Sequence, residues 1–224
     1  MRPQAGRGPL PLTLRNSLAE LILDAFDDRR ARRTLGALAD LEPDAAPAES
    51  SDAEGSGAPL WIEGPGGSLR VRSGYRAYLA TLKARAQAGL AAVETAPGPV
   101  GDDLATGLGR AEALAGHGLY FEVHELLEPL WLRAPGATRV ALQGLIQAAV
   151  GLQHLVNGNR AGARALVASG LDKTAAARGT LPLETAAWEA DLGRLLEGLE
   201  GLEAADRPRP AIPAWPSLRY RVWP

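Results

Sequence analysis

Apolar residues in the second half of the chain recur every three or four positions, a spacing that predicts amphipathic helices. Glycine and proline interrupt the pattern at four places: Gly116-His117-Gly118, Pro135-Gly136, Gly158 and Pro182. Helices are therefore predicted at residues 102–115, 118–133, 137–157, 159–178 and 184–203. Because the connections between them are short, neighbouring helices should run antiparallel and form an up-and-down bundle.

The first half of the chain has a pattern with more interruptions. The sequence Ser17-Leu18-Ala19-Glu20 has the form of a capping box, which predicts that a helix begins there. Residues 42–59 are rich in Pro, Ser and acidic residues and predict a flexible acidic linker. Residues 60–72 place apolar runs on both sides of a Gly/Pro segment, which predicts a β-hairpin, and helical spacing resumes from Tyr75.

The clearest domain boundary is Pro97-Gly98-Pro99. It predicts a helical extension at residues 1–97, a helical bundle at 98–205 and a Pro-rich, aromatic tail at 206–224. We expect the tail to pack on the bundle, because leaving Trp215, Tyr220 and Trp223 in water would be costly. The expected fold class is all-α: an up-and-down bundle preceded by a mostly helical extension with one β-hairpin.

The composition agrees with packed helices and excludes several chemistries. Hydrophobic residues make up 46% of the chain but aromatic residues only 5%, so the core must consist mainly of Leu, Val and Ala. The chain has no Cys, which excludes disulfides, thiolate metal sites and cysteine nucleophiles. Any metal centre would have to use carboxylates together with His117, His124 and His154.

The absence of Cys fits a cytoplasmic protein, and the charge pattern predicts no membrane segment. The formal net charge is −2, and no signal-peptide core is present near the start. Residues 140–159 carry no charge and have the length of a membrane span, but they include several Gln, His and Asn residues. These polar side chains indicate a helix buried in a globular core.

A dense set of polar and aromatic residues occupies positions 118–159. Over roughly residues 105 to 180, the chain resembles the bacterial and archaeal domain-of-unknown-function family numbered 309. This resemblance implies a small all-α bundle and no established reaction. Pro129 departs from the family pattern, which usually has a helix-forming residue there. The residues that carry the resemblance are Tyr120, Phe121, Glu122, His124, Glu125, Glu128, Trp131, Gln143, Gln147, His154 and Asn159.

Helix geometry places some of these residues on common stripes. On the predicted helix 118–133, Phe121, His124, Glu128 and Trp131 share one stripe, whereas Glu122 and Glu125 should lie further towards solvent. On the next helix, a narrow stripe of Gln143, Gln147 and His154 interrupts an otherwise apolar surface. With the two helices antiparallel, Glu128 should face Gln143, His124 should face Gln147, and His154 should approach His117 and Tyr120.

This register predicts a buried polar pocket formed by His124, Glu128, Gln143, Gln147 and His154, with Tyr120, Phe121 and Trp131 as its neighbours. The leading hypothesis is non-catalytic binding of a small ligand or a protein partner, and a homo-oligomer is also open. The alternative is a metal-dependent hydrolase in which His124 and Glu128 hold a divalent metal. Gln is a poor ligand for transition metals, which favours the hypothesis without a metal.

A second alternative is nucleic-acid binding through the N-terminal extension. Two clusters of basic residues motivate it, but acidic residues adjoin one of them and the whole chain is slightly acidic, so solvated helix faces are the favoured interpretation. The clusters are Arg29, Arg30, Arg32 and Arg33, and Arg70, Arg72, Arg76, Lys83 and Arg85.

Overall fold

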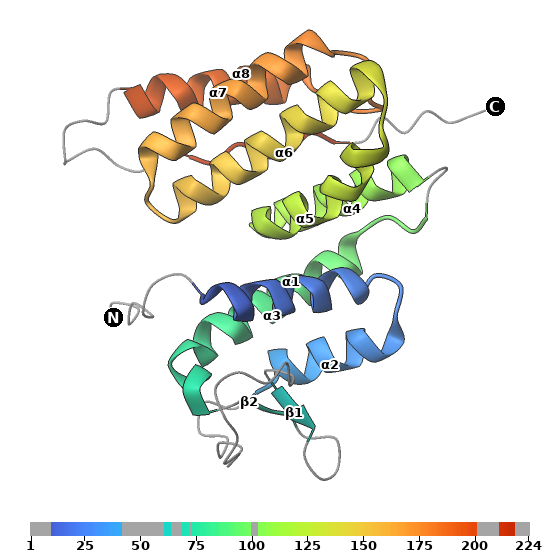
Figure 1. The fold of residues 1–224 in the computed structure, drawn as a ribbon, viewed down its shortest axis with the longest axis vertical. Helices are drawn as coiled ribbons and strands as arrows, with labels where there is room; N and C mark the ends of the chain where they lie inside the picture. Colours follow the sequence, from blue (N-terminus) through green and yellow to red (C-terminus); the bar gives the residue numbers. More distant parts are fainter. Residues whose placement is uncertain are drawn as a thin grey trace. The chain divides into compact units, whose positions relative to one another are not determined.

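The computed structural model describes residues 10–41, 61–63, 69–71, 73–99, 103–200 and 211–217 (Figure 1). The predicted acidic linker at 42–59, the tip of the predicted hairpin at 64–67, and Tyr220 and Trp223 lie outside these residues. The chain divides into two compact units, Met1–Glu94 and Thr95–Pro224, which are described separately below as unit 1 and unit 2.

Unit 1 contains three α-helices in the part that the structure describes: α1 (Leu12–Asp24), α2 (Arg29–Ala39) and α3 (Leu79–Thr95). A 3₁₀ helix, η2 (Ser73–Tyr78), leads directly into α3. Where the sequence predicted a hairpin, two strands of three residues, β1 (Trp61–Glu63) and β2 (Leu69–Val71), pair antiparallel with Ile62 opposite Arg70. Such a pair is far shorter than a sheet layer, so the fold class is all-α.

Helix α1 begins earlier than its sequence predicts. The first helical residue is Leu12, directly after Pro11, so Ser17 lies inside the helix and the predicted capping box is wrong. The buried face explains this start, because Leu14, Leu18 and Ile22 follow one another at intervals of four and are completely buried. Leu14 therefore extends the apolar face of α1 towards the N-terminus by one turn.

Polar side chains in unit 1 cap the ends of its helices. The Asp28 carboxylate accepts a hydrogen bond from Arg30 N at 2.7 Å and starts α2, which separates α2 from α1. Arg32 Nε donates to the Ala25 carbonyl oxygen at 3.2 Å, beyond the end of α1. From α3, Lys83 Nζ donates to the Leu41 carbonyl oxygen at 3.0 Å, just after α2. Cations at helix C-termini are favourable, so Arg32 stabilises the end of α1 and Lys83 stabilises the end of α2.

The described part of unit 2 contains α4 (Asp103–Gly116), α5 (Tyr120–Arg133), α6 (Gly136–Val156), α7 (Arg160–Ala176) and α8 (Ala186–Glu200). The helices predicted in this half are confirmed; the predicted start at 102 and the predicted end at 203 lie outside the described residues, and the other ends differ by two residues at most. Each helix packs against the next one in the sequence, as an up-and-down arrangement requires. Gly118, Gly136 and Gly158 at the turns have positive φ angles of 72°, 52° and 82°, which a residue with a side chain rarely adopts.

Helices α6 and α7 run side by side in unusually close contact (Figure 1). Glycines make this possible: a Cβ atom on Gly144 would lie 2.9 Å from the Gly170 carbonyl oxygen, and one on Gly170 would lie 2.8 Å from Ala148 N. Gly151 likewise approaches Val167 N, at 2.9 Å from its hypothetical Cβ. The two backbones therefore touch directly, which fixes the register between α6 and α7.

Candidate functional site

His124, the central residue of the predicted pocket, is paired with its neighbour on α5. Its Nδ1 lies 3.0 Å from Glu125 Oε1, and the two side chains are 26% and 38% exposed. The Phe121 ring lies 6.2 Å from the His124 ring, tilted by 44°, as expected for residues on one stripe. His124 is thus a half-buried imidazole whose Nδ1 lies beside the Glu125 carboxylate.

Glu122 is the residue that the sequence placed wrongly. It was expected towards solvent, but it is completely buried, as are Val123 and Leu127 of the same helix. The signal that could have found it is its distance of three residues from Leu119, which is itself 1% exposed and faces the core. Helix α5 also continues through Pro129, which lies on its exposed side.

Tyr120 contributes a phenol to the buried face of α5. It is 6% exposed, and burial raises the pKa of its hydroxyl above the ordinary value of 10.0, because the ionised form would lose its hydration. Tyr120 therefore stays neutral at all physiological pH values and can act only as a hydrogen-bonding group or a wall.

Gln147 makes its hydrogen bond with α7. Its Oε1 accepts from Ser169 Oγ at 2.9 Å, and Ser169 Oγ in turn accepts from Lys173 Nζ at 2.9 Å. The predicted register placed Gln147 opposite His124 on α5. The glycine-mediated approach of α6 to α7 accounts for the difference, because it brings the Gln147 side of α6 against α7.

His154 belongs to the junction between α6 and α7. Its Nδ1 lies 3.0 Å from Asn159 Nδ2, and Asn159 Oδ1 accepts from Gly162 N at 2.9 Å to cap α7. His117, the residue that His154 was predicted to approach, has Nε2 at 3.4 Å from Thr95 Oγ1. His154 and His117 therefore contact different partners, and each contact lies beside a different turn of the chain.

Of the remaining predicted pocket residues, Glu128 and Gln143 are half-buried on α5 and α6. Trp131 lies at the end of α5, and its indole nitrogen Nε1 is buried without a hydrogen-bond partner. Within the described residues, no group of three or more His, Asp or Glu is placed so that it could hold a metal ion. The structure thus places the predicted pocket residues in several separate contacts.

The end of α5 is fastened to the start of α6 by Arg139. Its Nη1 donates to the carbonyl oxygens of Trp131 and Leu132, at 3.3 and 3.0 Å, and its guanidinium carbon lies 4.5 Å from the centre of the Trp131 ring. The contact with Leu132 satisfies a carbonyl group at the end of the helix, the one with Trp131 adds a second donor to a carbonyl that also accepts from Ala134 N at 3.2 Å, and the guanidinium adds a cation–π interaction. The corner between α5 and α6 is therefore held in one geometry.

Beside this corner lies an open groove of about 480 Å³ between the first turn of α4, the last turn of α5 and the first turns of α6. We call it the corner groove. Leu104, Leu130 and Leu142 supply apolar lining, and Thr138 adds a hydroxyl group. Asp103 and Arg133 line the same groove and are both exposed, so it offers one charge of each sign.

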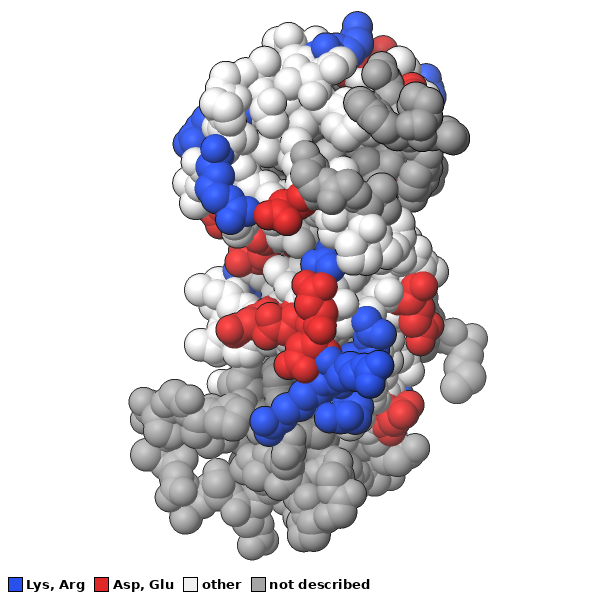
Figure 2. Space-filling view, turned by 90° about the vertical axis from the view of Figure 1, so that its right-hand side faces the viewer, with Lys and Arg blue, Asp and Glu red and all other residues white. Residues whose placement is uncertain are grey.

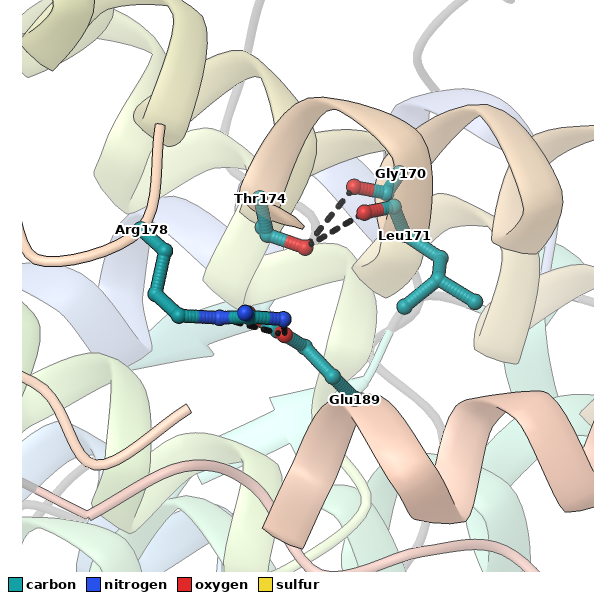
Figure 3. Close-up of polar contacts among 5 residues, drawn as sticks. All are labelled: Gly170, Leu171, Thr174, Arg178 and Glu189. Atoms are coloured by element: carbon teal, nitrogen blue, oxygen red, sulfur yellow. Dashed lines mark hydrogen bonds and ion pairs between the residues drawn. The ribbon is translucent and has the colours of Figure 1, made fainter. Parts of the chain in front are cut away.

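A second cluster of polar contacts lies between α7 and α8 (Figure 3). Arg178 forms an ion pair with Glu189, with its Nε at 3.0 Å from Glu189 Oε2, and this contact raises the pKa of Arg178. Thr174, one turn before Arg178, donates its hydroxyl hydrogen towards the carbonyl oxygens of Gly170 and Leu171, at 3.1 and 3.0 Å. Glu189 lies in the first turn of α8 and is 6% exposed. The ion pair therefore links the start of α8 to the residues that directly follow α7.

The surface shows charges of both signs. The face in Figure 2 carries small groups of Lys and Arg and small groups of Asp and Glu, with broad uncharged areas beside them. No helix in the described ranges is long and apolar enough to cross a membrane.

These observations define an all-helical protein whose second unit is a bundle of consecutively packed helices with a groove at one corner. Residues 108–166 match the model of a family described as a domain of unknown function, DUF309. The resemblance expected from the sequence is thereby confirmed for most of α4, all of α5 and α6, and the start of α7. No curated protein and no solved structure matches the chain.

Proposed function

We propose that unit 2 is a non-catalytic binding module that takes an apolar segment of a partner protein in the corner groove. The observation that carries this proposal is the combination of two partly exposed leucines, Leu104 and Leu130, with Asp103 and Arg133 in one open groove, which the completely buried Leu142 also lines. Its lining favours apolar side chains flanked by one acidic and one basic residue. The α5–α6 corner lies at the centre of the segment that matches DUF309.

Two further features support a protein as the occupant. The contacts of Arg139 hold the groove wall in place before binding, which lowers the entropy lost on association. Leu132 and Val140, on the two helices that form the corner, are 58% and 38% exposed. Neither residue lines the groove, but exposed apolar side chains on the helices of the same corner are typical of a surface that a partner covers.

The test uses peptides selected by display on the intact chain, whose affinities are then measured by fluorescence anisotropy. Thr138→Trp should fill the groove and weaken the selected peptides by about tenfold or more. Ala137→Trp is the matched control, because Ala137 is the preceding residue, is exposed and lies outside the groove lining. Peptides that bind the folded Thr138→Trp variant as tightly as the wild type would overturn the proposal.

The surroundings of His124 support a second candidate, the binding of a small polar ligand. Because the Glu125 carboxylate lies 3.0 Å from Nδ1, its negative charge favours a proton on Nδ1, which leaves Nε2 to meet a ligand beside the Phe121 ring. A fragment screen by saturation-transfer NMR tests this candidate. Fragments that contact the protein should lose binding in His124→Ala and keep it in His117→Ala, and equal binding to both variants would exclude the site.

The metal-dependent hydrolase remains a hypothesis that no contact in the described residues favours. Elemental analysis of protein purified without a His tag decides the question. Stoichiometric zinc, manganese, iron or nickel that disappears in His124→Ala would overturn the non-catalytic proposal.

A further inference from the structure

The segment 211–217 lies against the start of α8, although it contains no helix or strand. Trp215 packs edge-on against Trp188 of α8, with ring centroids 5.5 Å apart and an interplanar angle of 60°. Both rings are buried, with exposed fractions of 8% and 2%. The Ser217 carbonyl oxygen accepts a hydrogen bond from Glu184 N at 2.9 Å, just before α8. One tryptophan and one backbone hydrogen bond thus tie this segment to α8.

The polar atoms around this contact are poorly satisfied. Arg178 binds one oxygen of the buried Glu189 carboxylate, but the other oxygen has no partner (Figure 3). Trp188 and Glu189, in the first turn of α8, lie three and four residues after Thr185, the residue just before the helix, so all three lie near one another at its start. The buried atoms without a hydrogen-bond partner here are Thr185 Oγ1, Trp188 Nε1, Glu189 Oε1 and Trp215 Nε1.

These two features oppose each other. Packing of the two indole rings favours the docked segment, whereas leaving buried donors and acceptors without partners favours its release into water. Pro213 and Pro216 flank Trp215 and restrict the backbone to extended conformations, so little entropy is lost when the segment docks. An extended, proline-flanked tryptophan is a compact anchor of the kind that dominates peptide recognition.

We propose that Glu184, Thr185, Trp188 and Glu189 form a docking seat for an extended segment with a tryptophan between two prolines, and that the chain's own residues 211–217 occupy it reversibly. The seat recognises the indole through Trp188 and the backbone through the Glu184 N–H group. A peptide of the same chemistry competes with the built-in segment whenever that segment leaves the seat. This site is separate from the corner groove, with which it shares no residue.

A labelled synthetic peptide with the sequence of residues 211–217 tests the proposal by fluorescence anisotropy on the full chain. It should bind Trp215→Ala at least about tenfold more tightly than the wild type, because the wild-type segment competes at a high effective concentration. Ser217→Ala is the matched control: it keeps the backbone carbonyl and Trp215, so it should bind the peptide as weakly as the wild type. A peptide with Ala in place of Trp should not bind.

A second variant keeps both tryptophans and avoids a loss of folding. Because the chain has no Cys, the double variant Glu184→Cys, Ser217→Cys can form a single disulfide that locks the segment on its seat. The peptide should bind the reduced form as weakly as it binds the wild type, and this remaining binding should be lost on oxidation. Equal binding before and after oxidation, or no binding to a folded Trp215→Ala chain, would overturn the proposal; covalent dimers on oxidation would mean that a second copy supplies the segment and would also overturn it.

Discussion

At the scale of single residues, burial decides the behaviour of Tyr120. Because the pKa of its hydroxyl is raised by burial, the phenol stays protonated in the folded chain at a pH where the unfolded chain has begun to ionise. The contribution of Tyr120 to stability is therefore fully present below the unfolded pKa of 10.0 and is lost as the pH rises from there through the folded pKa. Tyr120→Phe removes this dependence.

The measurement is urea unfolding of the wild type and of Tyr120→Phe at about pH 8 and about pH 11. Subtracting the two proteins cancels the contributions of the other titratable groups. The wild type should lose more unfolding free energy than the variant between these two values. A difference between the two proteins that does not change with pH would show that the tyrosine ionises equally in both states.

The hydrogen bonds at the junction between α6 and α7 determine which ring nitrogen of a neutral His154 carries the proton. Since Asn159 Oδ1 accepts from Gly162 N, the amide nitrogen Nδ2 must face His154 Nδ1. An amide nitrogen can only donate, so Nδ1 must accept, and a neutral His154 carries its proton on Nε2. We predict this tautomer in long-range ¹H–¹⁵N NMR spectra of the imidazole.

Asn159→Asp gives the matched comparison, because aspartate also caps helices well. Its carboxylate can only accept hydrogen bonds, so His154 Nδ1 must acquire a proton to keep the contact. The NMR signature of Nδ1 should therefore change from acceptor to donor while the helix content stays the same. Finding a proton on Nδ1 of a neutral His154 in the wild type would contradict the described contact.

At the scale of helices, glycine sets the distance between α6 and α7. A Cβ on Gly170 would lie 2.8 Å from two backbone atoms, Ala148 N and Gly144 O, which cannot move without shifting the helix. Gly170→Ala should therefore lower the free energy of unfolding by about 1–3 kcal/mol despite the better helix propensity of alanine. Gly193 in α8 meets nothing within 4 Å, so Gly193→Ala should instead raise it by about 0.5–1 kcal/mol.

Chemical denaturation of the two alanine variants gives these free energies directly. The opposite signs make the comparison informative, because both changes add the same methyl group to a helix. If Gly170→Ala were as stable as Gly193→Ala, the backbones of α6 and α7 would not be in contact.

The same helices show what can be predicted from sequence and why. Glycine and proline mark the turns between α4 and α8, since they act through the local backbone, and these turns were predictable. Which helix Gln147 contacts depends on the close approach of Gly144 to Gly170. This contact is long-range, so helical periodicity cannot predict it. Ser17 failed as a helix start because Leu14 buries an earlier turn, a tertiary effect that outweighs a capping signal.

For Glu122 the reason is similar. Periodicity assigns it to the polar side because it is charged, whereas the packed unit buries that side of α5. Tertiary packing thus decided which polar residues of α5 became buried, and the sequence identified the helix but not that face.

At the scale of the whole molecule, the chain has two compact units, each with its own buried leucines. In unit 1 these include Leu14, Leu18, Leu35, Leu38 and Leu82, and in unit 2 they include Leu108, Leu114, Leu127, Leu142 and Leu145. A unit with its own core has the main requirement for independent folding. This division places the segment that matches DUF309 entirely within unit 2.

We therefore predict that residues 95–224 produced alone fold into a helical domain. Circular dichroism should show a helical spectrum and a single cooperative thermal transition, because the helices of this unit bury their apolar faces against one another. Gly170→Ala introduced into the fragment should lower its melting temperature, as in the full chain, since both partners of the α6–α7 contact are present. A fragment that is helical but melts without cooperativity would mean that unit 2 needs the first 94 residues to complete its core.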